Sequence, residues 1–135
     1  EAVLPLSGES VRINEDELWL GAPTIERLAP ARSLDAKIVV VKVTRPPRSA
    51  SGGIDKSALE ERFKAVVEER LRLLGVAARV ETKGKRQIVV DGRRVLGFSV
   101  RLGALDEQAS LIVQRVGVGG KRRMGCGVFT RTIGA

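Results

Sequence analysis

The dipeptide Asp91-Gly92 constrains the fold of this chain more than any other part of its sequence, because it specifies an antiparallel pairing. Asp-Gly favours a two-residue turn whose backbone twist matches that of a hairpin. The stretches on either side, 86–90 and 93–102, are rich in Val, Ile and Leu and are short enough to be strands. We therefore predict that they pair as neighbours, with a further extended stretch at 78–83 ahead of them.

One helix is predicted on each side of this hairpin. The first begins with the capping-box sequence SALE at 57–60, keeps apolar residues at helical spacing, and ends at Gly75. The second is shorter, with Asp106 as its N-cap and its end near Val116. The apolar face expected of the first helix comprises Leu59, Phe63, Val66 or Val67, Leu71 and Leu74.

Two more strands complete the pattern. The β-branched run KIVVVKVT at 37–44 is predicted to be a buried strand, and CGVFTRT at 126–132 a closing one. A loop at 45–53, containing proline and glycine, leads to the first helix. The order strand, helix, strand, strand, helix, strand is typical of an α+β, ferredoxin-like (βαββαβ, RRM-like) unit, whose antiparallel sheet carries both helices on one face. We assign this unit to residues 35–135.

The residues ahead of this unit are predicted to form a separate hairpin and a linker. Short alternating stretches at 11–13 and 18–20, joined by the polar turn 14–17, indicate the hairpin, and Trp19 is expected to pack within it. Because the chain opens with Glu1 rather than methionine, in the middle of a pattern, we expect a further segment to precede it.

A positive charge excess points to a polyanionic partner. The chain has 24 Lys and Arg against 16 Asp and Glu, a net charge of +8, and nucleic acid is the commonest polyanion in a cell. Aromatic residues make up 3%, so an array of stacking rings is not expected. One group of cations flanks the predicted hairpin, either as a solvated edge that discourages strand aggregation or as a track for phosphates. These cations are Lys83, Lys85, Arg86, Arg93 and Arg94.

The stretch GVGGKRRMGCG at 117–127, which we call the glycine loop, holds five glycines and three cations. It matches no nucleotide fingerprint, since Gly120-Lys121 is followed by Arg122 where a P-loop needs Ser or Thr, and GxGxxG also fails. Glycines allow close approach to a ligand and turn amides toward an anion, while Lys and Arg bind phosphate oxygens. The alternative is a surface loop with solvated cations. The candidate binding residues of the loop are Gly117, Gly119, Gly120, Lys121, Arg122, Arg123, Gly125 and Gly127.

No metal site and no organic cofactor are predicted. The single cysteine, Cys126, excludes an internal disulfide, fits a reducing, cytoplasmic location, and is expected to be a small core residue rather than a nucleophile. No residues show metal-ligand spacing. No apolar run is long enough to span a membrane, so no membrane partner is expected.

Four stretches resemble one known family. GVGGKRRMGCGVF, 117–129, resembles the C-terminal glycine-rich loop and following strand of the CRISPR repeat-processing endoribonucleases, the Cas-six family of the RAMP superfamily. RRVLGFSVRL, 93–102, resembles the strand before that family's second helix. The opening VLPLSGESVRI and LWLGAPTIERLAPA resemble the end of its N-terminal half. The resemblance therefore implies that residues 1–34 are the end of an N-terminal ferredoxin-like domain and a linker.

The resemblance implies an RNA-binding protein with two ferredoxin-like domains in tandem. Such proteins recognise CRISPR repeat RNA and cleave it without a metal, by attack of a ribose 2′-hydroxyl on the adjacent phosphate that leaves a 2′,3′-cyclic phosphate. The protein then supplies alignment, proton transfer and charge stabilisation. Many members stay bound to the guide RNA (crRNA) in an effector complex, so CRISPR repeat RNA, crRNA and other effector subunits are the implied partners.

The acid/base group is the one departure from this family. Its usual residue is a histidine in the N-terminal half, whereas this sequence has no histidine and no tyrosine. Lys121 or Arg122 can stabilise charge on the phosphate, but neither is expected to act as the base. We therefore expect no catalytic residue in this chain and place it in a preceding segment. The alternatives are a noncatalytic RNA-binding subunit of a CRISPR effector and a generic basic RNA-binding module of ribosomal type.

The same interpretation separates RNA binding from folding in the glycine loop. Replacing Gly119 and Gly120 with Val is expected to hinder close approach of RNA to the backbone. Replacing the cations at 121–123 with Ala is expected to remove phosphate contacts. Both changes are predicted to leave the fold intact.

Overall fold

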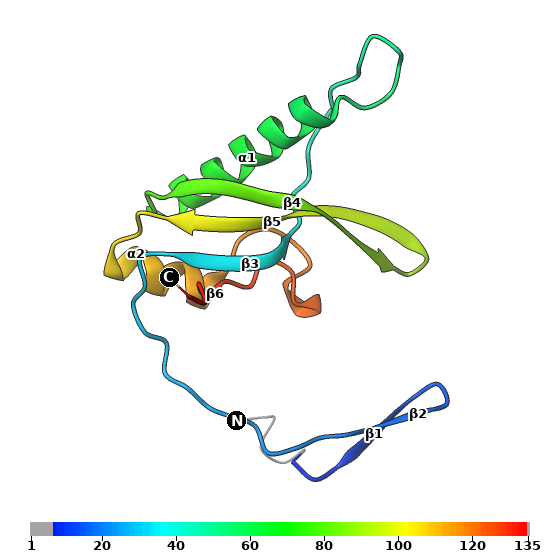
Figure 1. Cartoon of the computed structure of the whole chain (residues 1–135), viewed down its shortest axis with the longest axis vertical. Helices are drawn as coiled ribbons and strands as arrows, with labels where there is room; N and C mark the ends of the chain where they lie inside the picture. The colour runs from blue at the N-terminus through cyan, green and yellow to red at the C-terminus, as the bar shows by residue number, and fades with distance from the viewer. Residues whose placement is uncertain (1–6, 135) are drawn as a thin grey trace.

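The computed structural model describes residues 7–134, which form an N-terminal hairpin and an α+β body (Figure 1). Residues 1–6 and Ala135 lie outside the described part, and with them the start of the predicted first segment. The hairpin comprises β1 (Ser10–Ile13) and β2 (Asp16–Trp19). The elements of the body are β3 (Leu34–Val39), α1 (Lys56–Leu73), β4 (Arg79–Val90), β5 (Arg93–Gly103), α2 (Glu107–Val116), a short 3₁₀ helix (Arg122–Met124) and β6 (Thr130–Arg131).

The sheet of the body has the strand order β4-β5-β3-β6, and every neighbouring pair is antiparallel. The first and third strands of the body, β3 and β5, are therefore central, and the second and fourth form the edges. This is the arrangement of a ferredoxin-like βαββαβ unit. The predicted fold class is confirmed.

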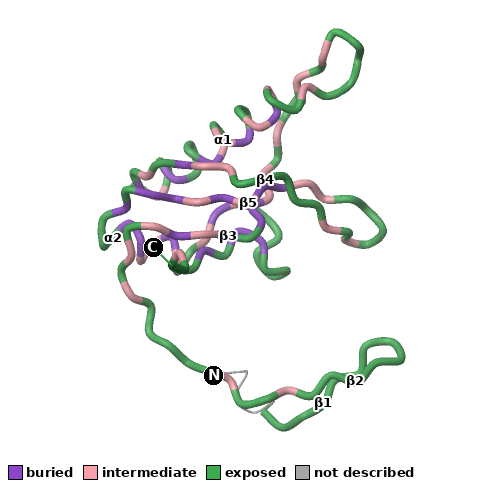
Figure 2. Tube along the Cα trace, viewed as in Figure 1, coloured by how far each residue is buried: buried purple, intermediate pink, exposed green. Residues whose placement is uncertain are grey.

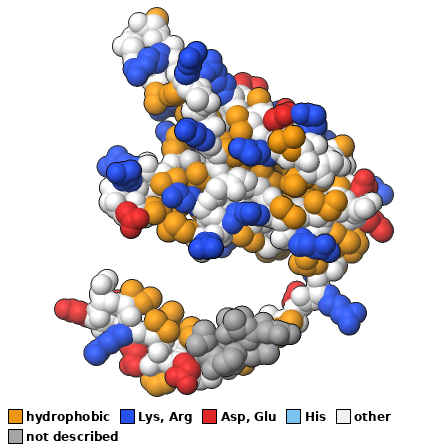
Figure 3. Space-filling model, turned by 180° about the vertical axis from the view of Figure 1, so that it is seen from behind, with side chains coloured by type: hydrophobic (Ala, Val, Ile, Leu, Met, Phe, Trp, Pro, Cys, Tyr) orange, Lys and Arg blue, Asp and Glu red, His pale blue; other side chains and the backbone are white. Residues whose placement is uncertain are grey.

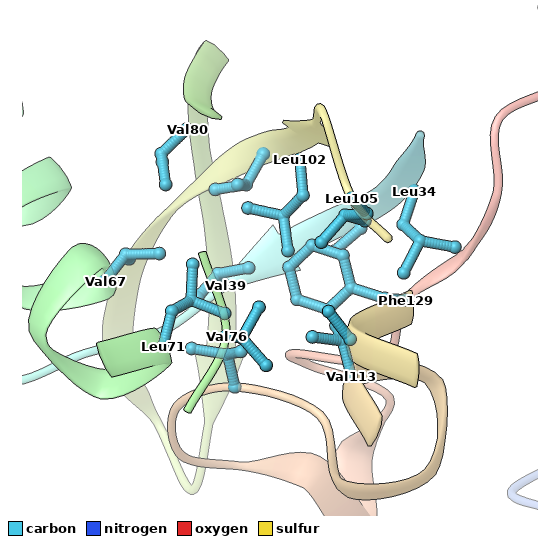
Figure 4. Close-up of a cluster of buried hydrophobic side chains, with 14 of the residues drawn as sticks. Leu34, Val39, Val67, Leu71, Val76, Val80, Leu102, Leu105, Val113 and Phe129 are labelled. Atoms are coloured by element: carbon cyan, nitrogen blue, oxygen red, sulfur yellow. The ribbon is translucent and has the colours of Figure 1, made fainter. Parts of the chain in front are cut away.

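Both helices pack on one face of the sheet (Figure 1), and Phe98, Val100 and Leu102, at alternate positions of β5, belong to the buried core between the sheet and the helices. Figure 2 shows the buried positions along the chain. Phe98 of β5 is 5% exposed, and its ring centroid lies 4.5 Å from that of Phe63 in α1. Val113 of α2 and Phe129, which follows the glycine loop, belong to the same cluster (Figure 4). Burial of each such side chain stabilises the fold by about 1.5–3 kcal/mol.

The predicted hairpin turn and the cap of the second helix are confirmed. Asp91 and Gly92 have φ values of 50° and 74°, the positive values that a two-residue hairpin turn requires. Asp106 is the N-cap of α2, and its carboxylate accepts a hydrogen bond from Ala109 N at 2.7 Å. These features depend on neighbouring residues alone, which is why sequence patterns locate them well.

The start of α1 differs from the prediction. Asp55 is the N-cap, and its carboxylate accepts a hydrogen bond from Ala58 N at 3.1 Å. The prediction of a capping box at Ser57 is therefore wrong, because Asp55 caps the helix two residues earlier and places Ser57 inside the first turn. Gly75 follows the helix with a φ of +73°, as predicted. The buried residues of the helix are Leu59, Phe63, Val67 and Leu71.

Three strands also differ from the prediction. β3 begins three residues before the predicted run 37–44, where β6 pairs with it, and ends sooner, at Val39. Val40 forms only an isolated bridge, to Gly120. The predicted closing strand 126–132 contracts to the two residues of β6, since the glycine loop occupies the space beside β3. β4 is one continuous strand with a bulge before Gly84.

The β1–β2 hairpin forms with a tighter turn than predicted and lies apart from the sheet (Figure 1). Ile13 pairs with Asp16, so the turn has two residues. Trp19 is 70% exposed, and its predicted packing is wrong, because a two-stranded ribbon has no second layer to cover the ring. The linker rejoins the body at Ala29, whose carbonyl accepts a hydrogen bond from Gln114 Nε2 at 2.8 Å. Two residues on, Ala31 N–H donates to Oγ of the buried Ser110 at 3.1 Å.

Candidate nucleic-acid interface

Backbone hydrogen bonds attach the glycine loop to the end of β3. Gly127 N donates to Ile38 O at 2.7 Å, and Gly120 N donates to Val40 O at 2.8 Å. The base of the loop is closed by Val118, whose N–H donates to Gly127 O at 3.1 Å and whose side chain is buried. The loop thus continues the sheet edge beyond β6 and leaves its central residues exposed.

Three glycines of the loop lie against the backbone of the protein itself. A Cβ at Gly117 would come within 2.6 Å of the Gly127 carbonyl oxygen, and one at Gly119 within 2.4 Å of the Val40 carbonyl oxygen. A Cβ at Gly127 would lie 2.0 Å from the Val118 carbonyl oxygen, and all three glycines have positive φ. Close packing inside the protein, rather than approach to a ligand, explains why these positions are glycine. Replacing Gly119 with Val should therefore disturb the fold, contrary to the prediction that it leaves the fold intact.

The other two glycines have open surroundings. A Cβ at Gly125 would meet nothing within 4 Å, although its φ of +83° favours glycine at the end of the 3₁₀ helix. At Gly120 the closest atom would be the Val40 carbonyl oxygen at 3.8 Å, and φ is outside the positive region. Of the five predicted glycines, Gly120 therefore best fits a role in approach to a ligand.

The three loop cations stand at its exposed tip. Lys121 adopts the left-handed conformation with a φ of 57°, and its carbonyl accepts a hydrogen bond from Met124 N at 2.9 Å. The Arg122 side chain lies back over Gly117, its Cδ 3.1 Å from where a Cβ would stand. The Arg123 side chain is exposed. Across residues 7–134, the ion pairs of the structure involve none of these three cations.

The predicted hairpin cations do not form a single row. Residues opposite each other on paired strands share a face of the sheet, and Lys85 stands opposite Phe98. Because side chains alternate along a strand, Lys85 and Arg94 lie on the face of Phe98, while Arg86 and Arg93 lie on the other face. A phosphate track along this hairpin would therefore use two of these four cations at a time, while the fifth predicted cation, Lys83, pairs with Glu81.

The tip of this hairpin and the tip of the glycine loop meet at one hollow. Arg93 and Lys121 line this hollow of about 330 Å³ together with Asp91. Seen from behind the sheet, Lys and Arg side chains spread across the body, and most acidic side chains on this face lie toward its edges (Figure 3). The structure therefore brings together two cation groups that the sequence places far apart.

A second hollow, of about 450 Å³, also has Lys121 in its wall. Lys42, which follows β3, and Arg70, in the last turn of α1, line it as well. Neither residue is among the binding residues predicted from the sequence. Lys42 falls in the predicted strand 37–44 and Arg70 on the polar side of a helix, so neither carries a local signal.

Ion pairs occupy the open face of the sheet. Arg101 and Asp35 are cross-strand partners joined by two hydrogen bonds, Nε to Oδ1 at 2.7 Å and Nη2 to Oδ2 at 2.9 Å. The Arg101 guanidinium holds the pKa of the Asp35 carboxyl below its ordinary value. Lys83 Nζ lies 2.9 Å from a Glu81 oxygen and lowers the pKa of that carboxyl. These cations are partly neutralised in place, which makes them weaker candidates for phosphate binding than those of the loop.

Cys126 is completely buried, which confirms its predicted role as a small core residue, although it precedes rather than begins the last strand. Within residues 7–134, no group of three His, Cys, Asp or Glu side chains is placed to hold a metal ion. In the same part of the chain, no helix is both long and apolar enough to cross a membrane.

Several known proteins are similar to this chain. A family model described as Cas6 Crispr matches residues 1–133. The CRISPR-associated endonuclease Cas6 of Myxococcus xanthus (strain DK1622) is 35% identical over 127 residues, covering 94% of this chain and 50% of that protein. The structure of Thermus thermophilus Cse3 bound to an RNA representing a pre-cleavage complex has a TM-score of 0.44 and 18% identity, covering 80% of this chain and 57% of that chain. The crystal structure of the CRISPR-associated protein Cas6e from Escherichia coli str. K-12 has a TM-score of 0.38 and 16% identity, covering 87% of this chain and 69% of that chain.

The extent of these matches differs. The chain spans about half the length of the Myxococcus relative, at 50% of that protein. Both TM-scores lie below 0.5, and the fold is established by the strand order instead. The family match extends over the hairpin as well as the body.

Proposed function

The chain belongs to the Cas6 family of CRISPR proteins, and from this membership we propose that it binds CRISPR repeat RNA as part of a repeat-processing endoribonuclease. The observation that carries the proposal is the family match over residues 1–133. The net charge of +8 and the exposed cations of the glycine loop support it, because phosphate contacts supply much of the affinity for RNA. Other effector subunits that retain the crRNA are further proposed partners.

The glycine loop and the β4–β5 hairpin are the proposed RNA contacts. Lys121, Arg122 and Arg123 would donate charge-assisted hydrogen bonds to phosphate oxygens. Gly120 leaves space for a phosphate beside the backbone, since a side chain there would meet little of the protein. Arg93 extends the contact from the loop to the hairpin across the hollow that it shares with Lys121.

In the proposed reaction, a ribose 2′-oxygen attacks the adjacent phosphorus and the bond from phosphorus to the 5′-oxygen breaks. A base removes the 2′-proton and an acid protonates the leaving oxygen, which gives a 2′,3′-cyclic phosphate and a 5′-hydroxyl without a metal. The sequence contains neither histidine nor tyrosine, so we assign the acid/base group to a residue outside these 135. The cations of this chain would stabilise the charge that develops on the phosphate.

We also propose that residues 1–34 belong to a neighbouring ferredoxin-like domain and its linker. The exposed β1–β2 hairpin supports this, because Val11, Ile13 and Leu18 share one of its faces and are 41%, 54% and 53% exposed. An exposed apolar patch of this kind is usually covered by a partner surface. The lack of a histidine and a tyrosine equally fits a noncatalytic RNA-binding subunit, which is the second candidate function.

RNA binding is tested by fluorescence anisotropy with the repeat RNA of the source genome. We expect tighter binding to this RNA than to duplex DNA of equal length, and a steep loss of affinity with salt. The variant K121A/R122A/R123A should flatten the salt slope by about one unit per lost contact. As a matched control, R12A/R27A/K56A removes the same charge elsewhere, from the β1–β2 hairpin, the linker and the start of α1. Equal losses in both variants would contradict specific contacts by the loop.

Cleavage is tested separately, with labelled repeat RNA in EDTA. The 135-residue chain should cut negligibly, while the protein encoded by the whole gene should release a product ending in a cyclic phosphate. Binding without cleavage by that whole protein would favour the noncatalytic subunit. Cleavage by this chain above a mock preparation would contradict the assignment of the acid/base group.

A further inference from the structure

We infer that Lys42, Arg70 and Lys121 form a second phosphate-binding subsite, on the hollow of about 450 Å³ beside the glycine loop. This inference rests on the proposed function and extends it. It assigns RNA-binding roles to Lys42 and Arg70, which lie outside the glycine loop and the β4–β5 hairpin. The ligand is a backbone phosphate of the bound RNA.

The three cations come from three separate segments that the fold brings together. Lys42 lies just after β3, Arg70 in the last turn of α1, and Lys121 in the glycine loop. All three residues are exposed, so their charged groups are available to a ligand. The backbone of Gly120, where a side chain would meet little of the protein, also lines the hollow.

The charge of this hollow is not balanced by the protein. No carboxylate lines it among residues 7–134, and none of its three cations takes part in the ion pairs of that part of the chain. The hollow at the hairpin tip includes Asp91, and the hollow on the open sheet face includes Asp35. Three like charges around one hollow repel each other, and a bound phosphate would relieve that repulsion.

Lys121 connects this subsite to the contacts already proposed. It lines both the hollow that contains Arg93 and the hollow that contains Lys42 and Arg70. An RNA backbone that follows the hairpin hollow would therefore cross the glycine loop at Lys121 and reach the second hollow. The subsite is thus a continuation of the same path.

The test is repeat-RNA binding by K42A/R70A over a series of salt concentrations. We expect an affinity loss of about tenfold or more near 0.1 M salt, and a salt slope flatter by about two units for two lost contacts. The control R12A/K56A removes one Arg and one Lys elsewhere, with Lys56 fourteen residues, or about 21 Å, along α1 from Arg70. The control should keep most of the affinity.

The remaining outcomes separate the subsite from the function. The charge-conserving variant K42R/R70K should retain binding. If K121A/R122A/R123A loses affinity while K42A/R70A does not, the subsite is overturned and the proposed function stands. Arg70 could instead act only on the C-terminal end of α1. In that case K42A/R70A should have a lower unfolding temperature and an unchanged RNA affinity, and this result would also overturn the subsite. Failure of the unmodified chain to bind repeat RNA in preference to duplex DNA would overturn both proposals.

Discussion

Gly119 lies so close to Val40 that a Cβ on the glycine would stand 2.4 Å from the Val40 carbonyl oxygen. The neighbouring Gly120 donates its N–H to that same oxygen at 2.8 Å. One carbonyl just after β3 thus both holds the glycine loop and restricts which residues can stand at position 119. The loop that carries the proposed RNA contacts is therefore part of the folded body.

This relationship predicts different effects for the glycines of the loop. Gly119→Ala should lower the free energy of unfolding by about 1–2 kcal/mol for the positive φ and by roughly another 1–3 kcal/mol for the clash. Gly125→Ala has a similar φ and no close neighbour, so it should show only the first cost. Gly120→Val should change stability little and weaken RNA binding. Urea unfolding and RNA anisotropy on the same preparations would check this, and equal stability of the first two variants would contradict it.

The N-cap of α1 provides a second prediction. Asp55→Ala should destabilise the protein by about 0.5–2 kcal/mol, because it removes the hydrogen bond from Ala58 N to the capping carboxylate. Ser57→Ala, in the first turn, should have almost no effect. Thermal unfolding of the two variants distinguishes the cap that the structure shows from the one that the capping-box pattern predicts. A larger loss for Ser57→Ala would reverse this assignment.

The Asp35–Arg101 ion pair predicts a pH dependence. Arg101 lowers the pKa of Asp35 in the folded protein below the ordinary value of 3.8. A lowered folded pKa contributes stability that is present above that value and is lost as the pH falls through the folded pKa. Asp35→Asn should therefore be less stable than the unmodified protein at pH 7, and the difference should shrink below about pH 4. Urea unfolding at several pH values measures it, and a difference independent of pH would exclude the ion pair as its cause.

The linker contact of Ser110 provides a further prediction. The buried Ser110 Oγ accepts a hydrogen bond from Ala31 N at 3.1 Å and donates to Glu107 O at 2.8 Å. Ser110→Ala should destabilise the protein by about 1 kcal/mol, since it leaves the Ala31 N–H without this acceptor. It should also speed proteolysis of the linker ahead of β3. Unchanged cleavage there would show that the hydrogen bond does not hold the linker.

Sequence patterns located the features that neighbouring residues control. The turn at Asp91-Gly92, the cap at Asp106 and the end of the first helix at Gly75 are all where the patterns place them. The ferredoxin-like class followed from the order of elements, and the strand order confirms it. The family followed from a resemblance at 93–102 and 117–129, where glycines and cations recur in a characteristic order, and the family match confirms it.

The boundaries that failed were those with competing local solutions. Ser57 has a capping-box sequence, yet Asp55 is the cap, because both residues can accept a hydrogen bond from the first turn. The last strand looked long because 126–132 contains β-branched and aromatic residues. The start of this stretch instead belongs to the glycine loop, where Gly127 N donates a hydrogen bond to Ile38 O.

What the sequence by itself determined is therefore the order of the elements, the turn at Asp91-Gly92, the cap at Asp106, and the family to which the chain belongs. Only the tertiary structure decided that Gly119 is required by Val40, that Asp35 pairs with Arg101, and that Lys42 and Arg70 share a hollow with Lys121. The physical reason is range. Turns and caps are made by hydrogen bonds between residues a few positions apart, whereas close packing and the gathering of charges depend on contacts between distant segments that form only when the sheet has folded.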